Sequence, residues 1–160
     1  MNDFESLFRI RLAREKDIPA IMDMTKEAFL KYQERSGSKQ LDALVETYED
    51  VKNDIQNKIV LVAIDDGEYV GSVRVEIFPD KTAILTRFGV RESNRNTGVG
   101  KSFMALIDRI MREGGVEKLY LYTASKVTEL IRFYYGRGFY IESTDTERGY
   151  IRAKLVKEYK

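Results

Sequence analysis

The sequence predicts a mixed α/β (α+β) fold in which helices flank a central sheet. Segments whose apolar residues recur at helical spacing alternate with short runs rich in valine and isoleucine. The chain has 160 residues, of which 43% are hydrophobic, and this size and composition are typical of one compact soluble unit. We therefore expect residues 1–160 to form a single domain.

The first third of the chain predicts one strand followed by two helices. Residues 7–13 have the pattern of the strand. Pro19 lies near the start of the first helix, and the sequence Ser36-Gly37-Ser38 ends it. Apolar side chains recur at helical spacing again from residue 42 onward, so a second amphipathic helix is expected over 42–56.

Three strands are expected to follow as a meander. Residues 58–65 and 68–78 are separated by Asp66-Gly67, a pair typical of tight hairpin turns. A third strand over 82–90 comes after the turn Pro79-Asp80-Lys81. Strands joined by such short turns are antiparallel neighbours.

The remainder of the chain alternates helix and strand. A helix begins at Gly98 and ends at Gly114-Gly115, as a C-terminal glycine signal predicts. The elements after it are expected to be a strand, a helix and two closing strands, over residues 118–123, 127–138, 139–144 and 150–156.

Composition removes several classes of function. Basic and acidic residues number 27 and 26, so the overall charge argues against a nucleic-acid partner. The longest apolar run, residues 59–64, is far too short to span a membrane, and we expect a cytoplasmic protein. The chain contains neither cysteine nor histidine, which excludes a Ser-His-Asp triad, a cysteine nucleophile and a Cys/His zinc site.

The junction between the third meander strand and the next helix holds the clearest candidate site. The first N–H groups of a helix lack partners within the helix and lie at the positive end of its dipole, so phosphates bind there. Gly98 and Gly100 allow a ligand to approach the backbone closely, and Arg95 and Lys101 add positive charge. The alternative is a turn that these glycines merely shape, with solvated basic side chains.

Two nucleotide-binding motifs do not fit this junction. The tripeptide Gly100-Lys101-Ser102 suggests a P-loop, but that motif requires a glycine where this chain has Arg95. The dinucleotide-binding fingerprint also fails, because Phe103 stands in place of its third glycine.

The same residues resemble the signature of the GNAT superfamily of acyl-CoA N-acyltransferases. That signature is arginine or glutamine, two residues, glycine, one residue, then glycine or alanine at a helix start, and Arg95, Gly98 and Gly100 match it. Tyr134, four residues before Gly138-Phe139, resembles the family's closing motif. The resemblance covers nearly the whole chain and implies a mostly antiparallel sheet with a splayed strand pair that receives acyl-CoA.

The resemblance further implies an N-acetyltransferase with acetyl-CoA as co-substrate and no metal. The third meander strand would hold the pantetheine arm and the helix start the pyrophosphate, through Phe88, Gly89, Val90, Arg95, Asn96, Thr97, Gly98, Val99, Gly100 and Lys101. This sequence departs from the family pattern at Thr97, where a basic residue is common, and at Val127, where an asparagine is common.

The chemistry implied by the resemblance is direct attack of an amine on the thioester, without a covalent intermediate. Tyr134 would protonate the leaving thiolate, although its position on an apolar helix stripe also fits a packed aromatic residue. A carboxylate or water must take the proton of the amine, since the chain has no histidine. Glu76 is the nominated base, and a solvated strand glutamate is the alternative for this residue.

The expected acceptor is a small-molecule or protein amine, without a nucleic-acid or membrane partner, and a homodimer is left open. Residues 15–57 contain ten acids and six bases, which suits a cationic amine and equally a solvated helical face. Two other classes are compatible with the sequence. One is a catalytically idle CoA-binding or sensory domain, and the other is a structural interaction domain that binds no CoA.

Overall fold

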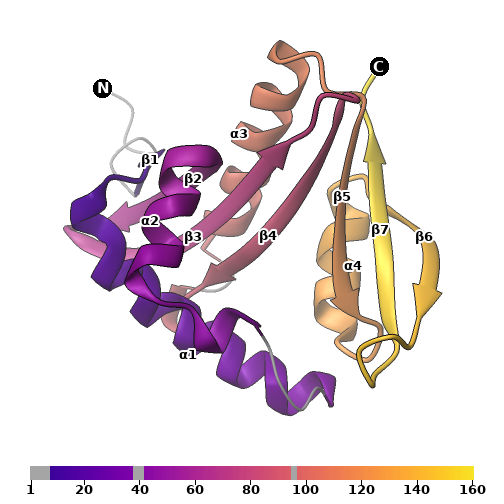
Figure 1. The fold of residues 1–160 in the computed structure, drawn as a ribbon, viewed down its shortest axis with the longest axis horizontal. Coiled ribbons are helices and arrows are strands. Elements are labelled where there is room, and N and C mark those ends of the chain that lie inside the picture. Colours follow the sequence, from indigo (N-terminus) through magenta and orange to yellow (C-terminus); the bar gives the residue numbers. More distant parts are fainter. Residues whose placement is uncertain (1–7, 38–41, 95–96) are drawn as a thin grey trace.

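The computed structural model describes residues 8–37, 42–94 and 97–160, and its elements follow the predicted order (Figure 1). The strands are β1 (Arg9–Leu12), β2 (Ile59–Asp65), β3 (Glu68–Ile77), β4 (Thr82–Val90), β5 (Lys118–Ala124), β6 (Tyr140–Asp145) and β7 (Arg152–Glu158). The α-helices are α1 (Ile18–Ser36), α2 (Tyr48–Asn57), α3 (Val99–Glu113) and α4 (Thr128–Gly136).

Local signals located most boundaries within about two residues. The third meander strand has the bounds expected from the sequence, Thr82–Val90. The first helix ends where predicted, because Gly37 takes a left-handed conformation with a φ of 79°. Asp66 and Gly67 both have positive φ, 50° and 81°, as a type I′ hairpin turn requires.

One seven-stranded sheet has the strand order β1-β2-β3-β4-β5-β7-β6. All neighbouring strands run antiparallel except β4 and β5, which run parallel. A parallel pair needs a long crossover connection, and α3 lies in that connection. The predicted mixed, mostly antiparallel sheet flanked by helices is thus confirmed.

The two parallel strands stay together at one end only. Their pairing runs from Thr82 opposite Lys118 to Ile84 opposite Tyr120 and goes no further. Figure 1 shows β4 and β5 diverging beyond this point. The splayed strand pair expected from the family resemblance is present, and it leaves one edge of β4 unpaired in the middle of the sheet.

Helices cover both faces of the sheet on the β1–β4 side of the splay. Side chains alternate along β2: Leu61 and Ala63 belong to the core cluster that includes α3, whereas Val60 and Val62 belong to a second cluster with α1 and α2. The helices α1 and α2 therefore lie on one face, and α3 lies on the other (Figure 1).

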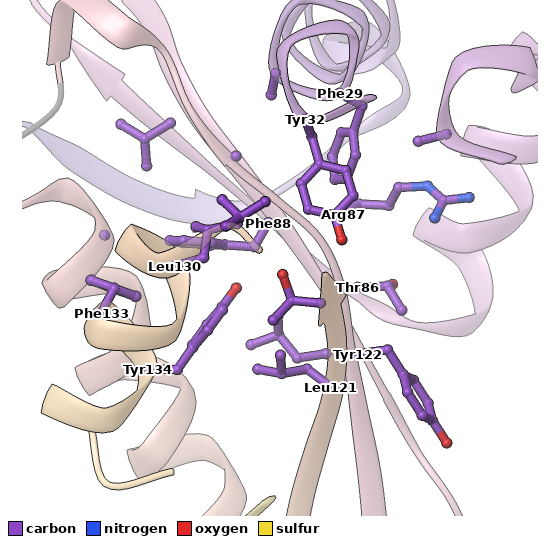
Figure 2. Close-up of a pocket in the computed structure, with 18 of the residues that line it drawn as sticks. Phe29, Tyr32, Thr86, Arg87, Phe88, Leu121, Tyr122, Leu130, Phe133 and Tyr134 are labelled. Carbon is purple, nitrogen blue, oxygen red and sulfur yellow. The ribbon is translucent and has the colours of Figure 1, made fainter. Parts of the chain in front are cut away.

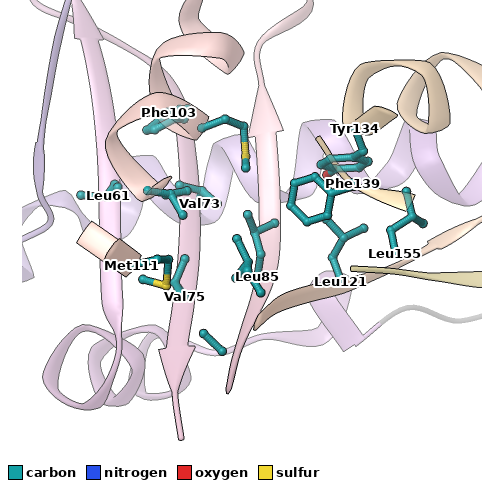
Figure 3. Packing of buried hydrophobic residues seen from close by; sticks show 14 of the residues in the cluster. Leu61, Val73, Val75, Leu85, Phe103, Met111, Leu121, Tyr134, Phe139 and Leu155 are labelled. Carbon is teal, nitrogen blue, oxygen red and sulfur yellow. The ribbon is translucent and has the colours of Figure 1, made fainter. Parts of the chain in front are cut away.

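The larger core cluster continues across the splay. Phe103 of α3 lies on the β3 side, and Leu121, Tyr134 and Phe139 lie on the β5 side (Figure 3). This shared core joins the two diverging halves of the sheet on the face of α3 and α4. Within the described ranges, no helix has the length and apolar content that crossing a bilayer would require.

The expectation of one continuous helix over 42–56 is wrong, because the structure divides this segment. A 3₁₀ turn covers Asp42–Val45, and α2 begins only at Tyr48. Thr47 has an extended backbone and forms a capping box with Asp50: its hydroxyl accepts from the Asp50 N–H at 3.2 Å, and the Asp50 carboxylate accepts from the Thr47 N–H at 2.9 Å. Local capping thus starts a new helix within a continuous apolar pattern.

Candidate functional site

A cavity of about 1220 Å³ opens where β4 and β5 diverge. Its lining comes from β4, β5, the second half of α1, the first turn of α3 and α4. Figure 2 shows its centre, with Tyr32 of α1, Phe88 of β4 and Tyr134 of α4 around it. Because the unpaired edge of β4 also lines the cavity, backbone groups as well as side chains are available to a ligand.

The start of α3 forms one end of the cavity. The predicted residues that line it there are Thr97, Gly98, Val99, Gly100 and Lys101. Gly98 caps the helix with a φ of 94°, and its carbonyl accepts the first helical hydrogen bond from the Ser102 N–H at 3.0 Å. No described atom lies within 4 Å of the place where a Gly98 side chain would begin. The free N–H groups of the first turn are therefore open to an anion.

Two of the predicted phosphate-binding residues, Arg95 and Asn96, lie outside the described residues. The turn on their N-terminal side ends at Asn94, which lines the cavity. Lys101 lines the cavity on the other side of this short gap. The described part of the predicted site is thus gathered at one end of the cavity.

An aromatic wall closes the cavity behind Gly100. The rings of Phe88 and Phe133 are stacked, with centroids 5.5 Å apart and planes at 16°, and the Tyr134 ring lies 6.1 Å from Phe88. A side chain at Gly100 would come within 3.2 Å of both phenylalanine rings. Packing of α3 against this wall therefore leaves little room for a side chain at Gly100, in addition to any role of Gly100 toward a ligand.

The unpaired edge of β4 presents backbone groups to the cavity. Phe88, Gly89 and Val90 all line it, as the sequence predicted. The N–H of Arg91 donates to β3 at 2.8 Å, and Gly89 is paired with β3. Since hydrogen-bonded and non-hydrogen-bonded positions alternate in an antiparallel pair, the backbone groups of Val90 face away from β3, toward the gap left by β5.

Tyr134 is buried, with 4% of its surface exposed, and it lines the cavity. In Figure 2 its hydroxyl lies at the cavity end of the ring. Within the described part of the chain, no residue is hydrogen-bonded to this hydroxyl. Burial, and to a smaller extent the neighbouring Tyr32, raise the pKa of Tyr134, so the phenol stays protonated at neutral pH.

Sequence reasoning missed a bulge in β4 at Arg87. Arg87 and Phe88 together stand opposite Val73 of β3, and Arg87 has a φ of 53°, in the left-handed region. That conformation costs a non-glycine residue about 1–2 kcal/mol, so the surrounding structure must hold it. No local signal predicts it, because arginine has no preference for positive φ.

The two residues of the bulge, Arg87 and Phe88, have side chains on opposite faces of the sheet. Phe88 packs against the core cluster that contains α3, whereas the Arg87 Nε donates to Glu46 at 3.2 Å, in the segment before α2. Both residues line the cavity. The cavity is therefore accessible from both faces of the sheet at this point of β4.

Tyr32 is a second residue that the sequence did not single out. Its hydroxyl accepts a hydrogen bond from the Ala124 N–H at 2.6 Å, which links α1 to the end of β5 across the cavity. Thr123 also lines the cavity, and among the described residues its buried hydroxyl has no hydrogen-bond partner. Tyr32 lies on the apolar stripe of α1, so its spacing indicated only packing.

A cluster of charged side chains lies on the α2 face of the sheet. Arg74 of β3 is fully buried and donates to Glu46 at 2.9 Å and to Asp54 at 2.8 Å. The Lys58 ammonium lies 3.2 Å from Asp54 and 3.7 Å from Glu76. Asp54 and Lys58 line the cavity.

The nominated base, Glu76, lies near the end of β3 with 40% of its side chain exposed. It is not among the described residues that line the cavity. The structure thus brings the predicted acid, Tyr134, together with the described cofactor-binding residues but leaves Glu76 outside. Across the described ranges, no cluster of three or more acidic, histidine or cysteine side chains is placed to hold a metal ion.

Comparison with known proteins gives a family and a shared fold. The family model of the acetyltransferase (GNAT) family matches residues 19–139, whereas no curated protein matches the sequence significantly. The chain is similar in structure to the paia N-acetyltransferase from Thermoplasma acidophilum, solved in complex with coenzyme A, with 21% identity, 95% of this chain and 99% of that chain covered, and a TM-score of 0.82. An acetyltransferase of the GNAT family from Streptococcus pneumoniae has 18% identity, coverage of 96% and 99%, and a TM-score of 0.78.

Proposed function

Since this chain belongs to the acetyltransferase (GNAT) family and is an acyltransferase, we propose that it transfers an acetyl group from acetyl-CoA to a primary amine by direct attack in a ternary complex. The observation that carries this proposal is the cavity between β4 and β5. It extends from the open N-terminus of α3 to the hydroxyl of Tyr134, and it reaches both faces of the sheet. A cofactor and an acceptor can therefore enter from opposite sides.

The pyrophosphate of acetyl-CoA would bind at the start of α3. The free N–H groups after Gly98 supply hydrogen-bond donors, the helix dipole favours negative charge, and Lys101 adds a cation. Arg95 and Asn96 are part of this proposed site through the family motif. The complex of the paia N-acetyltransferase with coenzyme A supports coenzyme A as the ligand of this fold.

The pantetheine arm would lie along the unpaired edge of β4. An amide-containing chain can there complete the backbone hydrogen bonds that β5 does not supply, at Val90 and its neighbours. The thioester would then lie near Phe88 and Tyr134, where the aromatic wall excludes water. Among the backbone N–H groups of residues 88–90, that of Val90 faces the cavity and is the proposed donor to the oxyanion that forms on the thioester carbonyl.

Tyr134 is the proposed general acid. The amine nitrogen forms a bond to the carbonyl carbon, the carbon–sulfur bond breaks, and the phenol gives its proton to the leaving thiolate. Burial raises the pKa of Tyr134, which by itself makes the phenol a weaker acid. The thiolate would form in the same buried place, and the same desolvation raises the pKa of its thiol, so the two effects partly cancel.

The proton of the amine would leave through water. Glu76 remains the proposed final proton acceptor. It lies outside the cavity, and Lys58 contacts both Glu76 and Asp54, which lines the cavity wall. Water in contact with Asp54 would then take the proton first. Because Glu76 does not line the cavity, it would act on the amine only through water.

Two measurements on the purified protein test the proposal. Calorimetry with coenzyme A is expected to show binding in the range typical of a specific cofactor site, and thiol release with acetyl-CoA and a panel of primary amines is expected to show amine-dependent turnover. Binding without thiol release from any amine would support an idle CoA-binding domain instead. Absence of CoA binding would reject the proposed site altogether.

A further inference from the structure

Arg87 lines the cavity toward the α2 face of the sheet, the side left for the acceptor because the proposed pyrophosphate site at the start of α3 is on the other face. Its neighbour Phe88 belongs to the wall on the α3 and α4 face, whereas Arg87 extends toward the α2 face of the sheet. Arg87 is partly exposed, at 24% of its side chain, and lines the cavity (Figure 2). The residue next to the proposed thioester position therefore carries a permanent positive charge.

Most of the hydrogen-bonding capacity of Arg87 is unused. Its Nε donates to one oxygen of Glu46 at 3.2 Å. Both oxygens of Glu46 already accept from the buried Arg74, so Glu46 is primarily the partner of Arg74. Among the described residues, no acceptor is hydrogen-bonded to either terminal nitrogen of Arg87. A guanidinium with two free, parallel N–H groups matches the geometry of a carboxylate.

Two other cations that line the cavity, Lys58 and Arg152, are more fully compensated. Lys58 lies within 3.7 Å of two carboxylates, those of Asp54 and Glu76. Arg152 donates from its Nε to both oxygens of Asp145, at 3.1 and 3.0 Å, whereas Arg148 makes one exposed contact, 3.3 Å from Asp42. In the described part of this wall, Arg87 is the cation whose nearest carboxylate is shared with a more closely bound, buried arginine.

The two carboxylates bonded to Arg74, Glu46 and Asp54, do not form a site for a cationic group. Glu46 and Asp54 both come from the acidic segment 15–57, but both are hydrogen-bonded to Arg74. Their negative charge is therefore engaged within the protein. What the cavity presents at this place is the guanidinium of Arg87.

We propose that Arg87 binds a carboxylate of the acceptor, so that the amine substrate is an α-amino acid. This inference rests on the proposed function and names the substrate class of the same site. In an α-amino acid the amine and the carboxylate share one carbon atom, so a carboxylate held by Arg87 brings the amine next to the thioester beside Phe88. The strained backbone of Arg87 in the β4 bulge would then have a function, because it holds this side chain toward the acceptor.

The test compares each of the standard L-amino acids with its carboxamide, which keeps the amine and removes the negative charge. Thiol release with acetyl-CoA gives kcat/KM, and calorimetry on the CoA-saturated protein gives affinity for the same probes. For at least one amino acid we expect a preference of about 10- to 100-fold over its amide, the range of a charge-assisted hydrogen bond. In Arg87→Met this preference is expected to fall to within about threefold, and in Arg87→Lys to be intermediate.

Arg109→Met is the matched control, because it removes the same charge from an exposed position on α3 that does not line the cavity. Comparing variants with the wild-type protein also cancels the difference in amine pKa between an acid and its amide. Equal affinity for every acid and its amide, or a preference that survives in a folded Arg87→Met, would overturn the inference. A preference seen by calorimetry without thiol release would uphold the carboxylate site and reject acetyl transfer.

Discussion

Tyr134 combines two properties that rarely occur together. It is almost fully buried among aromatic rings, yet its hydroxyl has no hydrogen-bond partner among the described residues. A buried hydroxyl that only supports packing usually has a partner, because an unsatisfied one costs free energy. Because Tyr134 lines the cavity, a ligand or water in the cavity can be the hydrogen-bond partner of its hydroxyl.

The first prediction at this scale concerns Tyr134→Phe, which removes the hydroxyl and keeps the ring. We expect kcat to fall by about 10²-fold or more, with little change in affinity for acetyl-CoA, because the lost group is a proton donor. We expect the melting temperature to stay nearly constant, since no described hydrogen bond is lost. Enzyme kinetics and thermal unfolding measure the two outcomes.

The catalytic assignment of Tyr134 fails if turnover persists at the wild-type rate under conditions where chemistry is rate-limiting. A large drop in melting temperature would instead show that the hydroxyl has a structural partner. The two readouts thus separate a catalytic role from a packing role in one variant.

The second prediction concerns Gly98, the capping residue of α3. Gly98→Asp places a carboxylate in open space at the helix N-terminus, where we propose that the pyrophosphate binds. We expect the affinity for coenzyme A to fall by at least about tenfold, because like charges would meet in one site. Gly98→Asn is the matched variant, with the same size and a similar tolerance for the φ of 94°.

Calorimetry with coenzyme A on both variants isolates the charge from the backbone effect. Asparagine is expected to reduce affinity less than aspartate does, by a factor that shrinks at high salt. Equal affinities for the two variants would mean that the pyrophosphate does not bind next to Gly98.

At the scale of elements, a buried carboxylate joins three segments near the start of α1. Asp17 accepts from both terminal nitrogens of Arg11 on β1, at 2.7 and 2.9 Å, and from the Arg14 N–H at 2.7 Å. The hydroxyl of Tyr69 on β3 also donates to it. These hydrogen bonds, those of Arg11 foremost, hold the pKa of Asp17 far below its usual range. The contact anchors α1, which forms one wall of the cavity.

We predict that Asp17→Asn lowers the free energy of unfolding by about 3 kcal/mol, since it leaves a partly buried arginine without its counter-charge. Urea denaturation at pH 7 measures the change. Asp23→Asn is the control, because it removes the same charge from an exposed position on the same helix. A loss no larger than that of the control would contradict the anchoring role.

The pH dependence of this contact has a definite sign. The pKa of Asp17 is lower in the folded than in the unfolded state, so its stabilisation is complete above the unfolded pKa of about 4 and is lost as the pH falls below it. The gap between the wild-type protein and Asp17→Asn should therefore narrow in acid.

At the scale of the whole molecule, several tyrosines are held protonated by the fold. Burial raises the pKa of Tyr134, burial and a hydrogen bond to Asp108 raise that of Tyr159, and burial together with Tyr32 raises that of Tyr150 to about 12. These residues come from α4, from the chain after β7 and from the segment before β7, so the effect belongs to no single element.

We predict that the protein loses stability from about pH 10 upward. The unfolded chain releases its tyrosine protons near pH 10, whereas the folded protein retains them to higher pH, so the folded state binds more protons and its free-energy advantage falls as the pH rises. Urea midpoints at pH 9, 10 and 11 measure the loss. Tyr134→Phe removes one of the groups and should make the decline shallower, while a midpoint constant to pH 11 would contradict the prediction.

Local physics explains what the sequence by itself determined about this protein. Apolar periodicity, β-branched runs and glycine signals depend on neighbours a few residues away, and they predicted the element order, the bounds of β4 and the glycine that ends α1. The open helix N-terminus at Gly98 follows from the same local rules. The family motif is also contained in a few neighbouring residues. The capping box of Thr47 and Asp50 is also a local signal, and it explains why α2 begins separately at Tyr48.

Only the tertiary structure decided how the candidate site is shared between elements. The positive φ of Arg87 is held by pairing with β3 and by Glu46, which is 41 residues away in the chain. The short pairing of β4 with β5 opens the cavity, and the bond from Ala124 to Tyr32 joins residues 92 positions apart. Glu76 lies outside the cavity, which its position on the strand did not indicate. Strand periodicity indicates which face a side chain takes, whereas the distance to a cavity depends on packing between segments that are remote in sequence.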